Sequence, residues 1–90
     1  MKKITFTLHA QLQAAERKAT LDEIKETIQT AQWEKAEQGR LTCTKTFVFR
    51  DEHYGRYYES KDVVPIFVDE VTEIVVITVY TFFSQKEVKS

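Results

Sequence analysis

The sequence predicts an α+β domain in which two helices near the amino end pack on one face of a mostly antiparallel sheet of four to five strands. Three observations lead to this fold class. An early alternating segment is followed by two stretches with helical spacing, the second half is rich in β-branched and aromatic residues, and the closing segment is apolar on both sides. Because 90 residues have room for one core, we expect one domain over 1–90, ordered at about 3–83 and frayed at 84–90.

The chain begins with a strand and a short helix. Residues 3–8 alternate apolar and polar side chains, as a half-buried strand does. The period then changes, and the new spacing predicts a helix near 9–18. Four apolar residues would form its buried stripe: Leu8, Leu12, Ala15 and Ala19.

The second helix has the clearest local signal in the sequence. Thr20 can cap its first turn, and the carboxylate of Glu23, three residues on, can return a hydrogen bond to the cap. Gly39 can adopt the left-handed conformation that ends many helices, so we expect this helix to run from about 20 to 38.

The rest of the chain is predicted to be sheet. We expect strands at 41–50, 56–61 and 63–68, separated by turn residues. Pro65 lacks a backbone donor, which favours an edge strand or a bulge there. The closing strand, 74–83, is apolar on both faces and is therefore expected in the interior of the sheet, with helices on one side and another cover on the other.

Composition excludes several classes of protein. The net charge of −1 lacks the basic excess of proteins that hold nucleic acid through phosphates alone. Cys43 is the only cysteine, so neither a disulfide nor a zinc motif is present, and we expect no metal and no cofactor. Charged residues interrupt every apolar run, and the amino end lacks a cleavage pattern, so we expect neither membrane association nor a signal peptide, and a cytoplasmic location.

Several short motifs are similar to those of one family. They are His9-Ala10 with Arg17 eight residues after the histidine, residues 20–24 opening a helix, and Thr78-Val79-Tyr80 in the closing strand. Together they resemble a family of small bacterial and cyanobacterial domains of unknown function that is placed with the RelE/ParE-type toxin superfamily. Two positions depart from that pattern. Gln13 replaces an arginine of the helix, and Val64-Pro65-Ile66 stand where the penultimate strand often has a histidine.

The resemblance implies a RelE-like fold and either of two functions. Several relatives in the superfamily are messenger-RNA endonucleases or gyrase poisons that an antitoxin holds in check. One interpretation is therefore a weak or lapsed metal-independent ribonuclease that acts on RNA and binds an antitoxin-like protein. The other is a non-catalytic protein-binding domain, with a protein partner or a second copy, that retains the toxin-like fold. The departures and the near-zero net charge favour the second, whereas the resemblance itself favours the first.

Six residues are the candidates for a ribonuclease site. Under this hypothesis one group transfers a proton, three cations stabilise the crowded phosphorane, and an aromatic ring orients or stacks on the RNA. His9 would transfer the proton, and Arg17, Lys45 and Arg56 would be the three cations. Tyr58 or Tyr80 would supply the aromatic ring.

Each candidate also has an ordinary structural interpretation. His9 can cap the helix or pack on the sheet, and Arg17 can form an ion pair. Lys45 interrupts an apolar strand face, so either it has a partner or it reaches water at a rim. Tyrosines such as Tyr58 are common in sheets. Trp33 lies off the stripe of the second helix, and packing against the sheet is favoured over a partner surface there.

Overall fold

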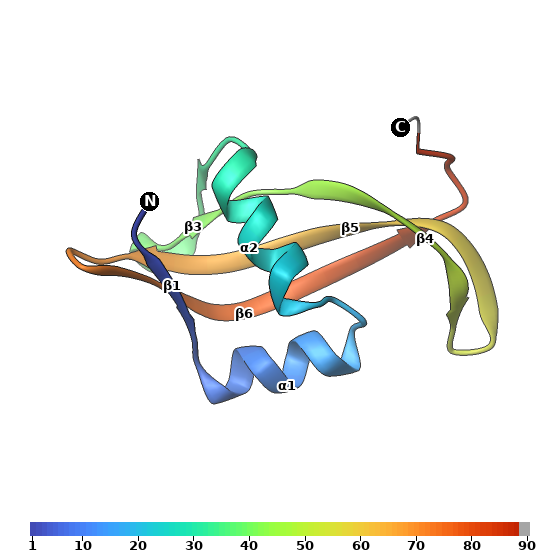
Figure 1. Ribbon diagram of the computed structural model, residues 1–90, viewed down its shortest axis with the longest axis horizontal. Helices are drawn as coiled ribbons and strands as arrows, with labels where there is room; N and C mark the ends of the chain where they lie inside the picture. Colours follow the sequence, from blue (N-terminus) through green and yellow to red (C-terminus); the bar gives the residue numbers. More distant parts are fainter. Residues whose placement is uncertain (89–90) are drawn as a thin grey trace.

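The α+β class is confirmed in a computed structural model of the chain, which describes residues 1–88. The elements follow one another as β1 (Lys3–Phe6), α1 (Leu8–Glu16), α2 (Leu21–Thr30), β2 (Glu34–Lys35), the short 3₁₀ helix η1 (Glu37–Gly39), β3 (Leu41–Thr42), β4 (Lys45–His53), β5 (Arg56–Asp69) and β6 (Glu73–Ser84). In Figure 1, α2 crosses in front of β5, and α1 runs along the lower edge beside β6.

The sheet has six strands and is thus larger than the four to five expected. Its order is β1-β6-β5-β3-β2, and β4 pairs with the other half of β5. All pairs are antiparallel except β1 with β6, which is parallel. The closing strand lies between β1 and β5, which confirms its predicted interior position.

Two of the predicted strand boundaries are wrong. The segments expected at 56–61 and 63–68 form one continuous strand, β5, because β6 pairs with it from Ser60 to Asp69 and β4 pairs with its first half. The strand expected at 41–50 is broken between Thr42 and Lys45. A register shift between Ile66 and Phe67 follows Pro65 directly, so a bulge does accompany the proline.

The second helix ends at Thr30, well before the predicted residue 38. Its start is as expected, since Thr20 and Glu23 form the full capping box. Its end is set by tertiary packing: the Trp33 indole nitrogen donates to the Ile28 carbonyl at 2.8 Å, and the indole meets the Phe67 ring edge-on at 5.0 Å between centroids. The packing interpretation of Trp33 is therefore confirmed, and the chain must leave the helix to allow it.

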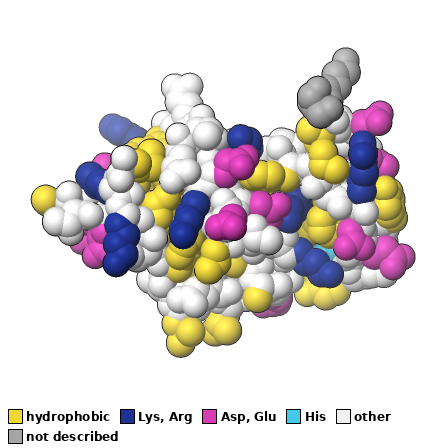
Figure 2. Space-filling view, in the orientation of Figure 1, with side chains coloured by type: hydrophobic (Ala, Val, Ile, Leu, Met, Phe, Trp, Pro, Cys, Tyr) yellow, Lys and Arg dark blue, Asp and Glu magenta, His cyan; other side chains and the backbone are white. Residues whose placement is uncertain are grey.

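The first helix spans Leu8–Glu16, and its predicted apolar stripe is wrong. Ala10 and Ala14 are the buried residues, whereas Leu8 is 70% and Leu12 is 62% exposed. The alanines lack bulk, so the helix backbone can approach the sheet closely on that side, and the leucines face outward. Figure 2 shows hydrophobic side chains at the lower edge of the molecule, where α1 lies.

The core lies between the two helices and one face of the sheet. Ile24 and Ile28 of α2 and the alanines of α1 pack against alternate residues of β5 and β6, among which Phe67 is fully buried. Full burial of a side chain as large as Phe67 contributes about 1.5–3 kcal/mol.

We call the opposite side of the sheet the open face, because no helix covers it in the described part of the chain. The strand registers place the following residues on it: Lys3, Thr5, Glu34, Thr42, Thr46, Val48, Ser60, Asp62, Val64, Ile66, Val68, Glu73, Val75, Thr78, Tyr80, Phe82 and Ser84. The interior strand thus has helices on one side only, and the cover expected on its other side is missing within residues 1–88.

A buried lysine joins the helices to the sheet. Lys61 of β5 is 5% exposed and faces the helices, and its ammonium donates to the Lys18 carbonyl and, at 2.8 Å, to the Glu23 carboxylate. The same Glu23 oxygen accepts the Thr20 backbone amide of the capping box. We call these contacts the Lys61 clamp; they hold the connection between α1 and α2 against β5.

The predicted tail at 84–90 starts one residue too early, since Ser84 still belongs to β6. Residues 85–88 follow without regular structure, and 89–90 lie outside the described residues. Within residues 1–88, no helix is both long enough and apolar enough to span a membrane.

Removal of the Lys61 ammonium should destabilise the fold strongly. Lys61→Met keeps the length of the side chain but leaves the Glu23 carboxylate and the Lys18 carbonyl without their donor, so we expect a loss of about 2–4 kcal/mol in the free energy of unfolding. Urea unfolding followed by circular dichroism measures it. The matched control is Lys2→Met, which breaks the exposed pair with Asp69 and should cost less than about 1 kcal/mol. Equal losses in the two variants would contradict the clamp.

The free energy of unfolding should depend on pH because the Cys43 thiol is buried. Burial raises the pKa of Cys43 from 9.0 to about 11, so folding favours the protonated form. Its contribution to the free energy of unfolding is therefore complete below pH 9 and falls as the pH rises toward about 11. Urea unfolding at pH 8 and pH 10.5 should show a steeper loss for the wild type than for Cys43→Ala, and parallel losses would refute this assignment.

Candidate functional site

The open face contains a hollow of about 290 Å³ beside Tyr80. Ile66 and Thr78 border it from neighbouring positions of β5 and β6, and Arg40 and Glu37 come from the η1 loop. Neither Arg40 nor Glu37 forms an ion pair with another residue in 1–88. This hollow and the apolar residues around it are the candidate site.

Two of the six predicted site residues, Arg17 and Tyr80, contact each other here. Arg17 follows the last turn of α1, and its guanidinium carbon lies 4.9 Å from the centre of the Tyr80 ring. The same guanidinium donates to the Val79 carbonyl at 2.7 Å, and the Arg17 carbonyl accepts the Thr81 hydroxyl at 2.9 Å. Arg17 therefore fastens the end of α1 to β6, and within residues 1–88 it forms no ion pair with an acid, as the alternative interpretation held that it would.

Lys45 has a partner on α2. Its ammonium lies 2.9 Å from the Glu26 carboxylate and 3.2 Å from the Thr30 hydroxyl, and it also approaches the Phe47 ring. This places Lys45 on the helix side of the sheet, whereas Tyr80 is on the open face. The partner interpretation of Lys45 therefore accounts for a lysine on an apolar strand face.

His9 lies in the first turn of α1 and is exposed. The cap of this helix is Thr7, whose hydroxyl accepts the Ala10 amide, so His9 does not serve as the cap. Gln13 points into the protein: its side-chain oxygen is buried and has no hydrogen-bond partner among the described residues.

Arg56 and Tyr58 form a separate pair at the hairpin of β4 and β5. The Arg56 guanidinium lies 5.7 Å from the centre of the Tyr58 ring. Tyr58 joins a half-exposed cluster in which Phe83 contacts it at 5.3 Å and stacks on His53 at 4.2 Å. On the same strand, burial and then the nearby Glu59 carboxylate raise the pKa of Tyr57. The hairpin is thus an aromatic cluster of its own.

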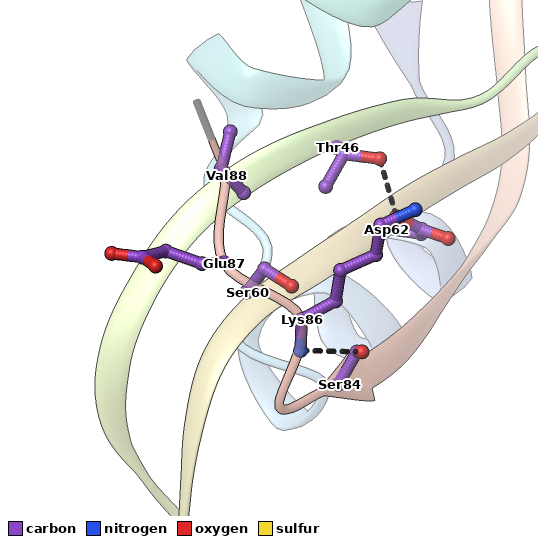
Figure 3. A pocket seen from close by; sticks show the side chains of 7 residues that line it. All are labelled: Thr46, Ser60, Asp62, Ser84, Lys86, Glu87 and Val88. Atoms are coloured by element: carbon purple, nitrogen blue, oxygen red, sulfur yellow. Dashed lines mark hydrogen bonds between the residues drawn. The ribbon is translucent and has the colours of Figure 1, made fainter. Parts of the chain in front are cut away.

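A second hollow, of about 300 Å³, lies where the chain leaves β6. Figure 3 shows Thr46, Ser60 and Asp62 of the open face around it, together with residues of the segment that follows β6. The Thr46 hydroxyl donates to the Asp62 carboxylate at 2.6 Å. Residues of the terminal segment thus line this end of the open face.

The sequence did not indicate the structural roles of three residues. Lys61, Arg40 and Phe82 owe their roles to contacts between distant segments or to the lack of a cover, neither of which a local pattern encodes. The one available signal was the two-sided apolar character of the closing strand. No group of three or more histidine, cysteine or acidic side chains within residues 1–88 is arranged to hold a metal ion.

Comparison of the chain with protein-family models, curated proteins and solved structures finds no match. The resemblance to the RelE/ParE-type superfamily stays a hypothesis that rests on the sequence motifs.

Proposed function

We propose that this chain is a non-catalytic protein-binding domain whose partner docks through an apolar surface on the open face. The observation that carries this proposal is the exposure of large apolar side chains on one uncovered sheet face: Phe82 is 60%, Val48 is 45% and Tyr80 is 44% exposed. Half-buried Val64 and Ile66 extend the surface of Tyr80 and Phe82, and Val48 lies at its end, beyond Asp62 and Ser60. Soluble monomers rarely expose a continuous apolar patch of this kind without an interaction that uses it.

The size of the open face suits a protein. With a rise of about 3.3 Å per residue and a strand spacing of about 4.8 Å, eight residues across four strands cover about 500 Å². A partner of equal extent would bring the total to about 1,000 Å², the range in which specific interfaces begin. The centre of the open face, with Val64, Ile66, Thr78 and Tyr80, carries no charge, so an apolar partner surface matches it. The charged residues that the registers place on this face lie around that centre: Lys3, Glu34, Asp62 and Glu73.

The cations of the predicted site also support binding over catalysis. A phosphorane needs donors aimed at the developing charge. Arg17 already donates to the Val79 carbonyl, and Lys45 is paired with Glu26. These contacts orient both cations toward groups of the protein, and the Glu26 carboxylate offsets the charge that Lys45 would offer a phosphate.

A second candidate function, toxin-like cleavage of RNA without a metal, is favoured by one observation. Arg17 lies over the exposed Tyr80 ring, and a cation beside an aromatic surface can hold a stacked base and its phosphate. An antitoxin-like partner belongs to this second proposal.

Site-specific photo-crosslinking in cells tests the docking proposal. A benzophenone amino acid in place of Val75, on the open face, should crosslink to protein, and the added substitution Phe82→Glu should reduce the yield at least about tenfold because it buries a charge at the interface. The matched control carries the same group in place of Lys25, which is exposed on α2. Equal crosslinking at the two positions, or none at Val75, would overturn the proposal.

An RNA-cleavage assay tests the second function against the first. If the domain is non-catalytic, the purified chain should leave labelled RNA intact, and its induction in bacteria should not arrest growth. Cleavage that is lost in both His9→Ala and Tyr80→Phe would show that the site is catalytic and would refute the non-catalytic proposal. Thermal unfolding of both variants serves as the control for folding.

A further inference from the structure

The open face is complementary to itself. It carries a protruding ring, Phe82, and a hollow beside Thr78, and these two residues lie on the same strand at equal distances before and after Tyr80. A two-fold axis that passes through Tyr80, in the plane of the interface and perpendicular to the strands, would therefore place the Phe82 of each copy over the hollow of the other. We propose that the partner on the open face is a second copy of this chain, docked face to face in this way; this rests on the function proposed above.

The charges of the same surface fit this arrangement. Asp62 pairs directly with Phe82 across β5 and β6, and Ile66 pairs with Thr78. The rotation that places Phe82 over Thr78 therefore also places Asp62 over Ile66, which borders the hollow together with Arg40. Each copy then contributes one carboxylate to the guanidinium of the other, and the two contacts are equivalent.

Both groups are available for this contact. Arg40 makes no ion pair with another residue in 1–88. The Asp62 carboxylate accepts a hydrogen bond from the neutral Thr46 hydroxyl and forms no ion pair with another residue in 1–88, and Lys86 lines the same hollow (Figure 3). A charge pair at the border of an apolar contact fixes the register of the two copies.

Apolar packing would supply the affinity. The hollow of about 290 Å³ is large enough for a phenyl ring, and Phe82 is 60% exposed in the single chain. Two such insertions, with Tyr80 facing its counterpart between them, form the centre of the interface. Sheets packed face to face keep their strands within about 30° of each other, which the two-fold arrangement allows.

Sedimentation equilibrium of the purified full chain, from low micromolar to near-millimolar concentration, tests the proposal. The wild type should approach twice the chain mass. Arg40→Asp sets two carboxylates against each other at both contacts, and Asp62→Arg does the same with two guanidinium groups, so each variant alone should dimerise roughly 10–100-fold more weakly. In an equimolar mixture the two variants should form a heterodimer, because both contacts then join opposite charges, one as the native Asp62–Arg40 pair and the other with the two charges exchanged.

Two charge reversals outside the open face are the matched controls. Lys35→Asp lies on the side of the sheet that Leu41 shares with the core, and Glu16→Arg lies on α1, so both should dimerise like the wild type. Phe82→Ala should weaken dimerisation without the charge change. Circular dichroism shows whether each variant is folded. Recovery of dimerisation in the mixture of Arg40→Asp and Asp62→Arg also requires that both variants are folded.

A wild-type chain that stays monomeric over this range overturns the second copy as partner, and so does a mixture that stays as weak as its components. These outcomes are distinct from failure of the proposed function. If the Val75 crosslink has the mass of a different protein, the docking surface stands and the second copy is wrong. If no crosslink forms there, both are wrong.

Discussion

The arrangement of this domain depends on one buried cation. Lys61 lies in the middle of the long strand β5, and its ammonium donates to the backbone where α1 ends and to the carboxylate that caps α2. A buried ammonium is costly unless its donors are satisfied, so the helix connection must stay close to β5 wherever the rest of the chain goes. Because Glu23 serves both the cap and the lysine, a local helix signal and a tertiary contact are satisfied by the same carboxylate. The clamp thereby holds both helices to one side of the sheet.

The open face follows from that constraint. A chain with two short helices tied to one side has no third element for the other, yet β6 is apolar on both sides. Its inward residues, such as Val76 and Val79, are buried on the helix side of the sheet, whereas Tyr80 and Phe82 remain exposed. Arg17 is the link between the two sides, since it extends from the end of α1 to the Val79 carbonyl and to the ring of Tyr80. The same geometry that completes the core therefore leaves an apolar surface with no cover within residues 1–88.

The parts of the fold that local chemistry decides could be predicted from the sequence. The capping box at Thr20 and the interior place of the 74–83 strand are examples, since the first depends on neighbouring residues and the second on composition. The end of α2 could not be predicted, because Trp33 must leave the helix to reach Phe67. The buried side of α1 could not be predicted either. The helix lies close to the sheet, so the small Ala10 and Ala14 face it, and Leu8 and Leu12 face outward. Helical spacing shows that one side is apolar, but it does not show which side has room.

Local sequence patterns predicted even less of the candidate site than of the fold. The motifs indicated Arg17 and Tyr80, which do contact each other, but Lys45 lies against α2 and Arg56 with Tyr58 lies at the far hairpin. Residue type alone suggested a catalytic role at each position, but the contacts of each side chain decide which role it has. Arg17 already binds the Val79 carbonyl and Lys45 already binds the Glu26 carboxylate, so both have a structural role. Cations that remain unpaired within the described residues, as Arg40 does beside an apolar hollow, are the ones that can recognise another molecule. The surface of this protein that is prepared for a partner is therefore the uncovered side of its sheet, and its function is best sought there.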